Sequence, residues 1–381
     1  IVMRLFYASH TYLVNENQKK LTAIAALPAV SHLACITPHL WREPVLGSVY
    51  PHQDPQANFE LLPTRIVLPG NEMRFVYLSS ACHLPSQRPD VIVAENGPGA
   101  FSYTQLLMAR NRFVPKAKAV FFTWWNIPYR PRQPLRALEA WNMRQSAGAI
   151  AGNQAAADIL RQNGFGGNIL VLPQLGVDEQ AFAPNPDSGA KVRAALGIAP
   201  DDPRPLIGYA GRLVPEKGLQ VLMDALQGWQ SGFHLLMIGN GALKEPLAHW
   251  GANLPSGQML HLQASVPHSQ IAEWMNALDV FVLPSLSTPF WLEQFGHVLI
   301  EAMSCAVAVV GSSSAEIPNV IGTAGRVVPE GDALALRQAL SELCKNPAER
   351  KALAQAGRQR VLNTYTHAQI ARQTLEFLQT L

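Results

Sequence analysis

Short apolar runs alternate with amphipathic stretches along the first half of the chain, at spacings that predict strands and helices in turn. The strand candidates are 3–9, 33–37, 90–94 and 118–123, and the helix candidates are 15–27 with Asn15 as the N-cap, 102–112 and 134–146. This alternation is typical of an α/β fold with a doubly wound parallel sheet. The Pro-rich stretch 41–75 follows neither period and is compatible with antiparallel strands.

Residues 279–312 carry the clearest unit of the second half. An apolar run at 279–284, a polar loop, a helical segment from about His297 to Cys305 and an apolar run at 306–311 predict strand, loop, helix and strand. In such a unit the loop lies at the carboxyl edge of a parallel sheet, where ligands bind. Gly296 lets the chain turn into the helix, whose free backbone N–H groups suit a phosphate.

Two carboxylates frame the start of that helix, Glu293 in the loop and Glu301 inside the helix. One binding site can meet both, with one carboxylate on a sugar hydroxyl and the other on a ribose. The alternative is that Glu293 only complements the helix dipole and that Glu301 is a solvated helix residue.

A second candidate region is LIGYAGRLVPEKG at 206–218, which predicts a strand, a turn and a helix start. Gly211 permits close backbone approach, Arg212 can bind phosphate oxygens bidentately, and Lys217 adds a point charge. Two cations suit a leaving nucleoside diphosphate, because its negative charge grows as the bond to the sugar breaks.

The bulk composition narrows the class of protein. A chain of 381 residues is long enough for two domains, and its 48% hydrophobic and 15% charged residues favour a globular fold over a disordered one. No apolar run approaches the roughly 18 residues of a membrane-spanning helix. The segment IVMRLFYAS is expected to be a core strand and not a cleavable signal, since no basic segment precedes it. The 4 cysteines follow no metal or disulfide pattern, which favours a reducing cytoplasm.

Charge is uneven along the chain. Residues 1–172 carry 16 Lys+Arg against 9 Asp+Glu, whereas 173–381 carry 14 against 18. The excess concentrates at 110–144, where basic and aromatic side chains are interleaved and Glu139 is the only acid. This mixture is compatible with contact to anionic lipid headgroups, and a solvated basic face over buried aromatic residues is the alternative. The whole-chain excess of +3 is too small to favour nucleic-acid binding.

The two glutamates are part of a longer pattern, with Phe-Gly shortly after the first and Ala-Met directly after the second. It consists of Glu293, Phe295, Gly296, Glu301, Ala302 and Met303. In this pattern the chain resembles the GT-B retaining glycosyltransferases of family 4, also called glycosyl transferases group 1. The chain departs from the family's usual Gly or Pro at Ala306, Ala308 and Ala315, which concerns loop geometry and not the identity of the site.

The resemblance implies two Rossmann-like doubly wound domains that face a central cleft. The implied division is an N-terminal acceptor-side domain at 1–172, a hinge at 173–203 and a nucleotide-sugar domain at 204–364. A C-terminal helix at 365–381 is expected to pack back on the first domain.

The resemblance also implies a set of donor-binding residues. Arg212 and Lys217 are expected on the diphosphate and Glu293 on the sugar hydroxyls, all three as catalytic residues. Glu301 is expected on the ribose. The wider donor set is Gly211, Asn240, Val266, Phe295, Gly296, His297 and Val298.

Three loops of the first half follow predicted strands, where an acceptor-side site is expected. Their candidate residues are His10, Asn15, Glu95 and Asn126. Structural roles are the alternative, because a carboxylate or an amide at a strand end often forms a turn. The third loop holds Trp124 and Trp125 but no His, so no catalytic His is carried over from the family.

The expected function is that of a retaining hexosyltransferase-type glycosyltransferase, which moves a sugar from a UDP- or GDP-linked donor to a glycan, glycolipid or small-molecule acceptor. No cofactor and no metal are expected. The alternatives are a catalytically weak nucleotide- or carbohydrate-binding relative and, further away, a phosphorylase or epimerase on the same architecture. The expected location is cytoplasmic, with peripheral contact to the inner face of the membrane through 110–144 and no nucleic-acid partner.

Overall fold

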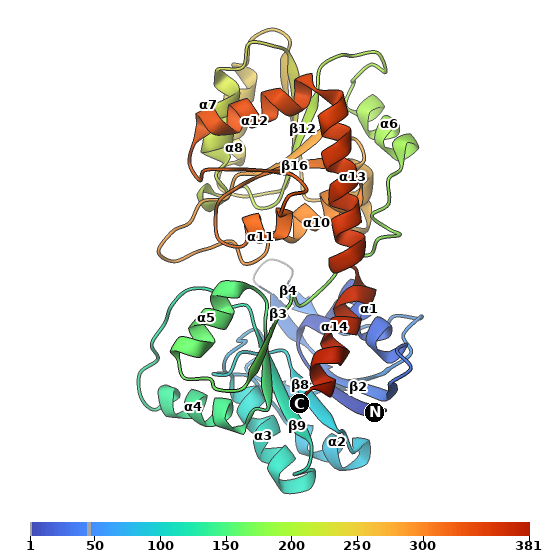
Figure 1. The fold of residues 1–381 in the computed structure, drawn as a ribbon, viewed down its shortest axis with the longest axis vertical. Helices are drawn as coiled ribbons and strands as arrows, with labels where there is room; N and C mark the ends of the chain where they lie inside the picture. Colours follow the sequence, from blue (N-terminus) through green and yellow to red (C-terminus); the bar gives the residue numbers. More distant parts are fainter. Residues whose placement is uncertain (1, 44–46) are drawn as a thin grey trace. The chain divides into compact units, whose positions relative to one another are not determined.

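The chain forms two compact units in the computed structural model, which describes residues 2–43 and 47–381, without the side chains of 80–82. Unit 1 runs up to Gly176 and includes His367–Leu381, and unit 2 comprises Val177–Thr366 (Figure 1). Each unit contains a parallel sheet covered by helices. The prediction of two Rossmann-like α/β domains is therefore confirmed.

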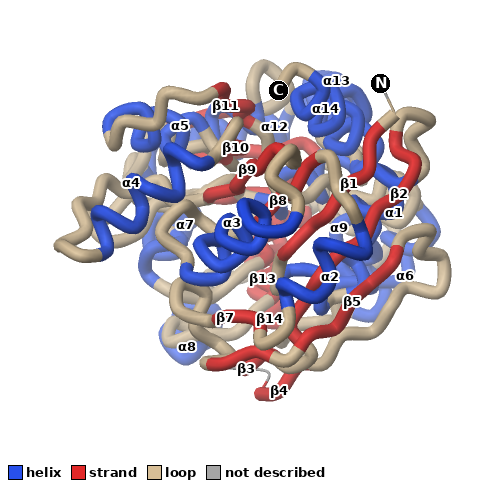
Figure 2. The backbone as a smooth tube through the Cα atoms, turned by 90° about the horizontal axis from the view of Figure 1, so that it is seen from below, coloured by secondary structure: helices blue, strands red, loops and turns tan. Residues whose placement is uncertain are grey.

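Unit 1 is built on a seven-stranded parallel sheet, part of which Figure 2 shows as neighbouring red strands. In spatial order its strands are β11 (Asn168–Val171), β10 (Gly148–Ala151), β9 (Lys118–Thr123), β8 (Val91–Ala94), β1 (Met3–Ala8), β2 (Val30–Pro38) and β5 (Glu60–Thr64). The order reverses between β1 and β8, so a crevice for ligands is expected at the carboxyl ends of these two strands.

Helices cover both faces of this sheet. They are α1 (Asn15–Ala25), α2 (Ser80–Gln87), α3 (Phe101–Phe113), α4 (Leu135–Gln145), α5 (Gln154–Gln162) and α14 (His367–Gln379). Side chains alternate along β1, where Phe6 joins one buried cluster with α3, and Leu5 and Tyr7 join another with α1 and α14. The C-terminal helix α14 is thus part of the core of unit 1, beside α1.

The stretch 41–75 contains antiparallel pairing and one strand of the main sheet. Two short hairpins pair β3 (Trp41–Glu43) with β4 (Gly47–Val49) and β6 (Ile66–Val67) with β7 (Val76–Tyr77). Between them β5 adds to the edge of the parallel sheet although it contains Pro63, since an edge strand tolerates a missing N–H donor. Residues 44–46 of this stretch lie outside the described residues.

The prediction that Asn15 is the N-cap of α1 is wrong. A 3-10 turn at Thr11–Leu13 leads directly into the helix, and Val14 takes the extended N-cap conformation. Asn15 is the first helical residue, and no side chain caps this helix end. Instead, the side chain of Asn17 ties the turn to the helix by donating to the carbonyl oxygen of Thr11 at 2.9 Å.

Unit 2 is built on a six-stranded parallel sheet. Its strands in spatial order are β14 (Gln258–Gln263), β13 (Phe233–Ile238), β12 (Leu206–Ala210), β15 (Val280–Leu283), β16 (Ala308–Ser312) and β17 (Arg326–Val328). The strand order reverses between β12 and β15. By the general rule for open α/β sheets, ligands bind outside the carboxyl ends of these two strands.

The helices of unit 2 follow the strands in the usual alternation. They are α6 (Pro186–Ala195), α7 (Leu219–Gln227), α8 (Lys244–Ala252), α9 (His268–Met275), α10 (His297–Ser304), α11 (Ile317–Ile321), α12 (Ala333–Lys345) and α13 (Pro347–Thr364), with a 3-10 turn at Pro215–Lys217. Helix α6 lies inside the stretch 173–203 and is capped by the side chain of Asn185. In the part of the chain that the structure describes, no helix has the length and apolar character needed to cross a membrane.

A polar cluster away from the carboxyl edge joins β13, β14 and the loop before β12. His234 contacts His261 at 3.0 Å (Nδ1 to Nε2) and Asp202 at 3.2 Å (Nε2 to Oδ2), while Arg204 binds the same carboxylate. Burial lowers the pKa of both histidines, although Asp202 opposes this effect on His234. The hydrogen bonds from Arg204 hold the pKa of Asp202 below its usual range. The folded state thus favours two neutral histidines.

We expect this cluster to make the stability of unit 2 depend on pH. The folded histidines have lower pKa values than the unfolded ones, which bind protons near pH 6.5. The unfolded state therefore binds more protons, and the free energy of unfolding falls as the pH drops through this range. Each histidine contributes a slope of at most about 1.4 kcal/mol per pH unit. Urea unfolding at several pH values checks this. His261→Asn should reduce the slope, whereas the exposed His249→Asn should not, and equal slopes for all three proteins would contradict the assignment.

Candidate functional site

Two of the predicted catalytic residues meet at the switch point of unit 2. Lys217 ends the 3-10 turn that follows β12, and Glu293 lies in the loop that follows β15. The Lys217 ammonium is 2.6 Å from Glu293 Oε2, and the Ser285 hydroxyl donates to the same oxygen at 2.9 Å. The ammonium also lies 4.8 Å from the centre of the Trp291 ring, a cation–π contact.

Backbone contacts hold these two loops together. Gly218, directly after Lys217, has φ +68°, and a Cβ there would lie 1.8 Å from the carbonyl oxygen of Pro284. Next to this contact, the Leu286 N–H donates to the carbonyl oxygen of Glu216 at 2.9 Å. A residue with a side chain at 218 cannot keep this approach, so glycine is required where the loops meet.

Arg212 lies in the same loop as Lys217, and its side chain is 59% exposed. Its backbone is fixed by the Tyr209 hydroxyl, which donates to the Arg212 carbonyl oxygen at 2.7 Å. The guanidinium forms one surface ion pair with Glu216 at 3.3 Å, and such pairs contribute little. The Arg212 side chain is therefore accessible to an anionic ligand.

Helix α10 begins at this edge of the sheet and carries the second predicted carboxylate. Gly296, with φ +78°, is its N-cap, and Glu301 is its fifth residue. His268 Nε2 and His297 Nδ1 contact Glu301 Oε1 at 2.9 Å and 3.3 Å. Burial alone raises the pKa of this carboxyl, but the hydrogen bonds and charges of the two histidines lower it to about 2. Glu301 is thus ionised at neutral pH.

The remaining residues of the predicted donor set lie around this edge. Asn240, in the loop after β13, donates to the Ser265 hydroxyl at 3.0 Å, and Val266 follows in the loop after β14. The backbone of Leu213, two residues after Gly211, donates to the Asn240 carbonyl oxygen at 2.9 Å. Phe295 is buried against Tyr365, and Val298 is the second residue of α10.

Two of the alanines that depart from the family's pattern have left-handed backbone conformations. Ala306 has φ +56° and Ala315 has φ +45°. Ala306 is the residue after the C-cap of α10: its N–H donates to Met303 and the N–H of Val307 donates to Ala302, the two bonds of a Schellman motif. Glycine is usual at this position. The chain therefore retains the local turn without the glycine, at a cost of about 1–2 kcal/mol per strained residue.

In unit 1, the candidate Glu95 is enclosed in a buried network. The Lys20 ammonium lies 2.5 Å from Glu95 Oε1, and Gln174 donates to Oε2 at 2.8 Å. Gln174 also contacts Thr11 at 3.0 Å and accepts from the Trp124 ring N–H at 2.9 Å. Both oxygens of Glu95 have partners, and the Lys20 and Glu95 side chains are almost fully buried. This geometry supports a role in the scaffold.

The other acceptor-side candidates lie near the same edge of unit 1. His10 follows β1, stacks on Trp41 with ring centres 4.7 Å apart and approaches Glu72 at 3.6 Å. Its Nδ1 atom is buried without a hydrogen-bond partner in the described structure. Asn126 is buried in the segment after β9, and Asn15 is partly exposed at the start of α1. Of these three, His10 is at the switch point of unit 1.

Several residues of these sites have no signal in the sequence. His268, Ser285 and Trp291 contact the predicted donor residues, and Lys20 and Gln174 hold Glu95. His268 follows the Val266-Pro267 pair, but nothing in that segment indicates its contact with a helix 33 residues away.

Comparisons with known proteins find similar sequences and similar structures. Residues 195–360 match the family model described as glycosyl transferases group 1. An alpha-maltose-1-phosphate synthase of Mycobacterium tuberculosis is 30% identical over 226 residues, which cover 55% of this chain and 56% of that protein. A GDP-mannose-dependent alpha-(1-6)-phosphatidylinositol monomannoside mannosyltransferase of Mycolicibacterium smegmatis is 30% identical over 197 residues, or 50% of this chain and 51% of that protein. The chain thus spans about half the length of the curated relatives it matches.

Among solved structures, the chain is similar to Anabaena HepE, determined in complex with UDP. The TM-score is 0.68 at 18% identity, over 99% of both chains, so this likeness concerns the fold. The match over residues 195–360 and the two parallel-sheet units lead to one conclusion. Residues 195–360 resemble the glycosyl transferases group 1 family, and the chain has the GT-B fold.

Proposed function

We propose that the protein is a retaining glycosyltransferase that takes a sugar from a UDP- or GDP-linked donor. The observation that carries this proposal is the arrangement at the switch point of unit 2. There, Lys217 and Glu293 are paired at 2.6 Å beside the accessible Arg212, and the ionised Glu301 lies on the helix that starts at the same edge. The family match over residues 195–360 covers all four residues.

Each residue has a distinct task in the proposed reaction. Arg212 and Lys217 neutralise the diphosphate, and Lys217 has enough N–H donors to bind a phosphate oxygen while it keeps Glu293. The first backbone N–H groups of α10, at His297 and Val298, add hydrogen bonds and the positive end of the helix dipole. Glu293 accepts from the sugar hydroxyls, and Glu301 accepts from the ribose.

The proposed course is a front-face displacement that retains the anomeric configuration. The acceptor hydroxyl attacks the sugar carbon from the side of the leaving group, its proton passes to the departing phosphate, and the bond from the sugar to the diphosphate breaks. Arg212 and Lys217 stabilise the charge that develops on the phosphate. Two protein cations supply this stabilisation, which supports a transfer without a divalent metal.

Unit 1 is proposed to receive the acceptor, which is a glycan, a glycolipid or a small molecule. His10, at the switch point of unit 1, is the strongest contact candidate because its Nδ1 is buried without a partner in the described structure. Asn15 and Asn126 are further candidates, whereas Glu95 is held by Lys20 and Gln174. The name of the mycobacterial mannosyltransferase indicates a lipid acceptor for that relative.

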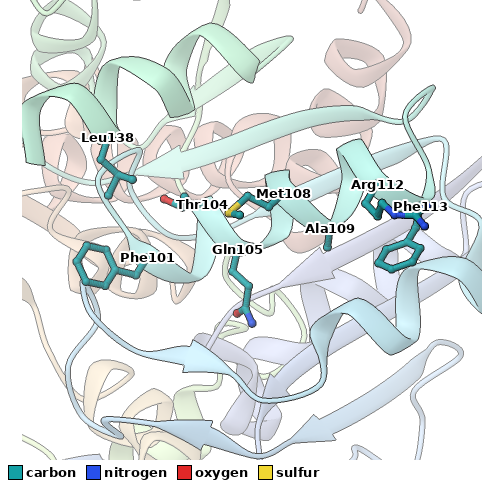
Figure 3. A pocket seen from close by; sticks show the side chains of 8 residues that line it. All are labelled: Phe101, Thr104, Gln105, Met108, Ala109, Arg112, Phe113 and Leu138. Atoms are coloured by element: carbon teal, nitrogen blue, oxygen red, sulfur yellow. The ribbon is translucent and has the colours of Figure 1, made fainter.

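A surface of unit 1 favours a location at the cytoplasmic face of a membrane. A cavity of about 570 Å³ follows one face of α3 (Figure 3). Its lining includes Phe101, Met108, Phe113 and, from α4, Leu138. Met108 is 62% exposed and Phe113 is 44% exposed, so large apolar side chains face solvent here. Such a patch suits the acyl region of a lipid surface.

The exposed charged side chains within 110–144 are all basic. Arg112, in the cavity lining, and Lys116 are exposed at the end of α3, and Arg132 and Arg136 are exposed around the start of α4. Glu139, the only acid in 110–144, is buried and bonded to the Tyr129 hydroxyl. We propose that this surface binds anionic lipids, with the apolar side chains below the headgroups and the basic ones among them.

The donor proposal is tested by a thermal-shift and calorimetric screen of UDP, GDP, ADP and TDP and their sugars, in EDTA. We expect one diphosphate to stabilise the wild-type protein selectively, and Glu301→Ala to reduce this stabilisation because the ribose contact is gone. Binding of a nucleotide sugar without transfer or hydrolysis would favour the catalytically weak relative. Stabilisation by none of the four would contradict the donor site.

The cations of the donor site give a second prediction. Arg212→Ala and Lys217→Ala should each weaken binding of the nucleoside diphosphate by roughly 1.5–3 kcal/mol, as for hydrogen bonds between charged groups. The exposed Lys191→Ala is the matched control and should bind normally. Calorimetric titration measures the affinities, and unchanged values in both site variants would exclude these residues from the donor site.

The lipid surface is tested by sedimentation with vesicles of phosphatidylcholine alone or mixed with phosphatidylglycerol. Only the anionic vesicles should bind the protein, and salt should weaken the binding. Met108→Ser/Phe113→Ser and Arg112→Gln/Lys116→Gln should each reduce it by about 10-fold or more. The control Met259→Ser/Leu334→Ser removes equally exposed apolar side chains from unit 2. Equal binding by all variants would refute this surface.

A further inference from the structure

Two histidines from different helices hold the carboxylate of Glu301, and both contact the same oxygen. His268, the first residue of α9, contacts Oε1 through Nε2 at 2.9 Å. His297, one turn before Glu301 on α10, contacts Oε1 through Nδ1 at 3.3 Å. An ionised carboxylate only accepts hydrogen bonds, so each of these ring nitrogens carries a proton.

This arrangement gives the two carboxylate oxygens of Glu301 different environments. Both side-chain hydrogen bonds that Glu301 receives in the described structure end on Oε1. Oε2 therefore keeps its acceptor capacity, and the rotation of the carboxylate about its last bond is restrained. A ligand hydroxyl can bind Oε2 without displacing either histidine.

We infer that His268 is a positioning residue of the donor site. Together with His297, it holds Glu301 so that Oε2 faces the ribose hydroxyls of the nucleotide. This inference rests on the proposed function, because it assumes that Glu301 binds the ribose. It extends the donor site to α9, a helix that carries none of the predicted donor residues.

The position of His268 is suited to this role. The centre of its ring lies 5.4 Å from the centre of the Phe182 ring. Helix α9 follows β14 and begins at the carboxyl edge of the sheet, where α10 also begins. Half of the side chain is exposed, whereas Glu301 is 9% exposed, so the histidine lies between the buried carboxylate and solvent. The contact keeps Glu301 charged in a place where burial alone favours its neutral form.

His297 has a second feature that indicates a ligand. Its Nε2 atom is buried and has no hydrogen-bond partner in the part of the chain that the structure describes. A buried ring nitrogen without a partner is costly, and a bound ligand can supply the missing hydrogen bond. His297 thus has one nitrogen for Glu301 and one for a ligand at the start of α10.

The competing explanation is that His268 only forms a structural contact between α9 and α10. Recognition of the ribose hydroxyls distinguishes this structural role from a positioning role. UDP and GDP are titrated by calorimetry beside their 2′,3′-dideoxy analogues, and the ratio of the two affinities measures recognition of the ribose hydroxyls. A structural role changes the stability of the protein but not this ratio. A positioning role changes the ratio.

We expect the wild-type protein to prefer the ribonucleotide over its dideoxy analogue by roughly 10-fold, as for a hydrogen bond to a charged group. His268→Ala should remove most of this preference, and His268→Gln should keep it, because the amide N–H can replace Nε2–H. His249→Ala, an exposed histidine on α8, is the matched control. Melting temperatures of all variants check the fold.

The Glu301→Gln variant shows whether His268 acts through Glu301. Glu301→Gln should lose the ribose preference by itself, and adding His268→Ala should change the ratio no further. A full ribose preference in His268→Ala, or an equal loss in His268→Gln, overturns the positioning role while the donor site stands. Failure of the wild-type protein to bind UDP or GDP overturns both the donor site and this inference.

Discussion

The contact between the loops after β12 and β15 is the constraint on which the donor site depends. These loops lie on either side of the point where the strand order of unit 2 reverses, which is where ligands bind in open α/β sheets. The close approach of Gly218 to Pro284 sets their distance, and the Lys217–Glu293 ion pair joins their side chains. Arg212 and the start of α10 take their positions from the same two loops. The Lys217–Glu293 pair is thus held in place by the backbone contact between the two loops.

The residues that the sequence reveals are those whose chemistry is local. Glu293 and Glu301 are separated by a loop and one helical turn, and Arg212 and Lys217 lie in one turn after a strand, so their spacing allows a shared site. Their partners could not be predicted in this way. The Lys217–Glu293 contact joins residues 76 apart in the sequence, and His268 and Glu301 are 33 apart. Such pairs depend on strand order, which periodicity does not determine.

The same distinction explains what the sequence could not show in unit 1. The strand β5 was hidden by Pro63, because a proline signals irregular structure unless the strand is known to lie at an edge. Asn15 has the right residue type for an N-cap, but the preceding turn shifts the start of α1 by one residue. Glu95 looks like a site residue at a strand end, and only the buried Lys20, 75 residues away, shows that its charge is already balanced.

The use of α14 in unit 1 has a consequence for the synthesis of the protein. Ile370 and Leu375 belong to the buried cluster that also contains Leu5 and Leu21, so one face of the first sheet lacks part of its cover until α14 is made. The ribosome must translate 190 residues of unit 2, Val177–Thr366, in the meantime. At typical rates of 5–20 residues per second this takes about 10–40 s. The domain encoded second is therefore able to finish folding first, and the nascent unit 1 exposes an apolar surface that chaperones can bind.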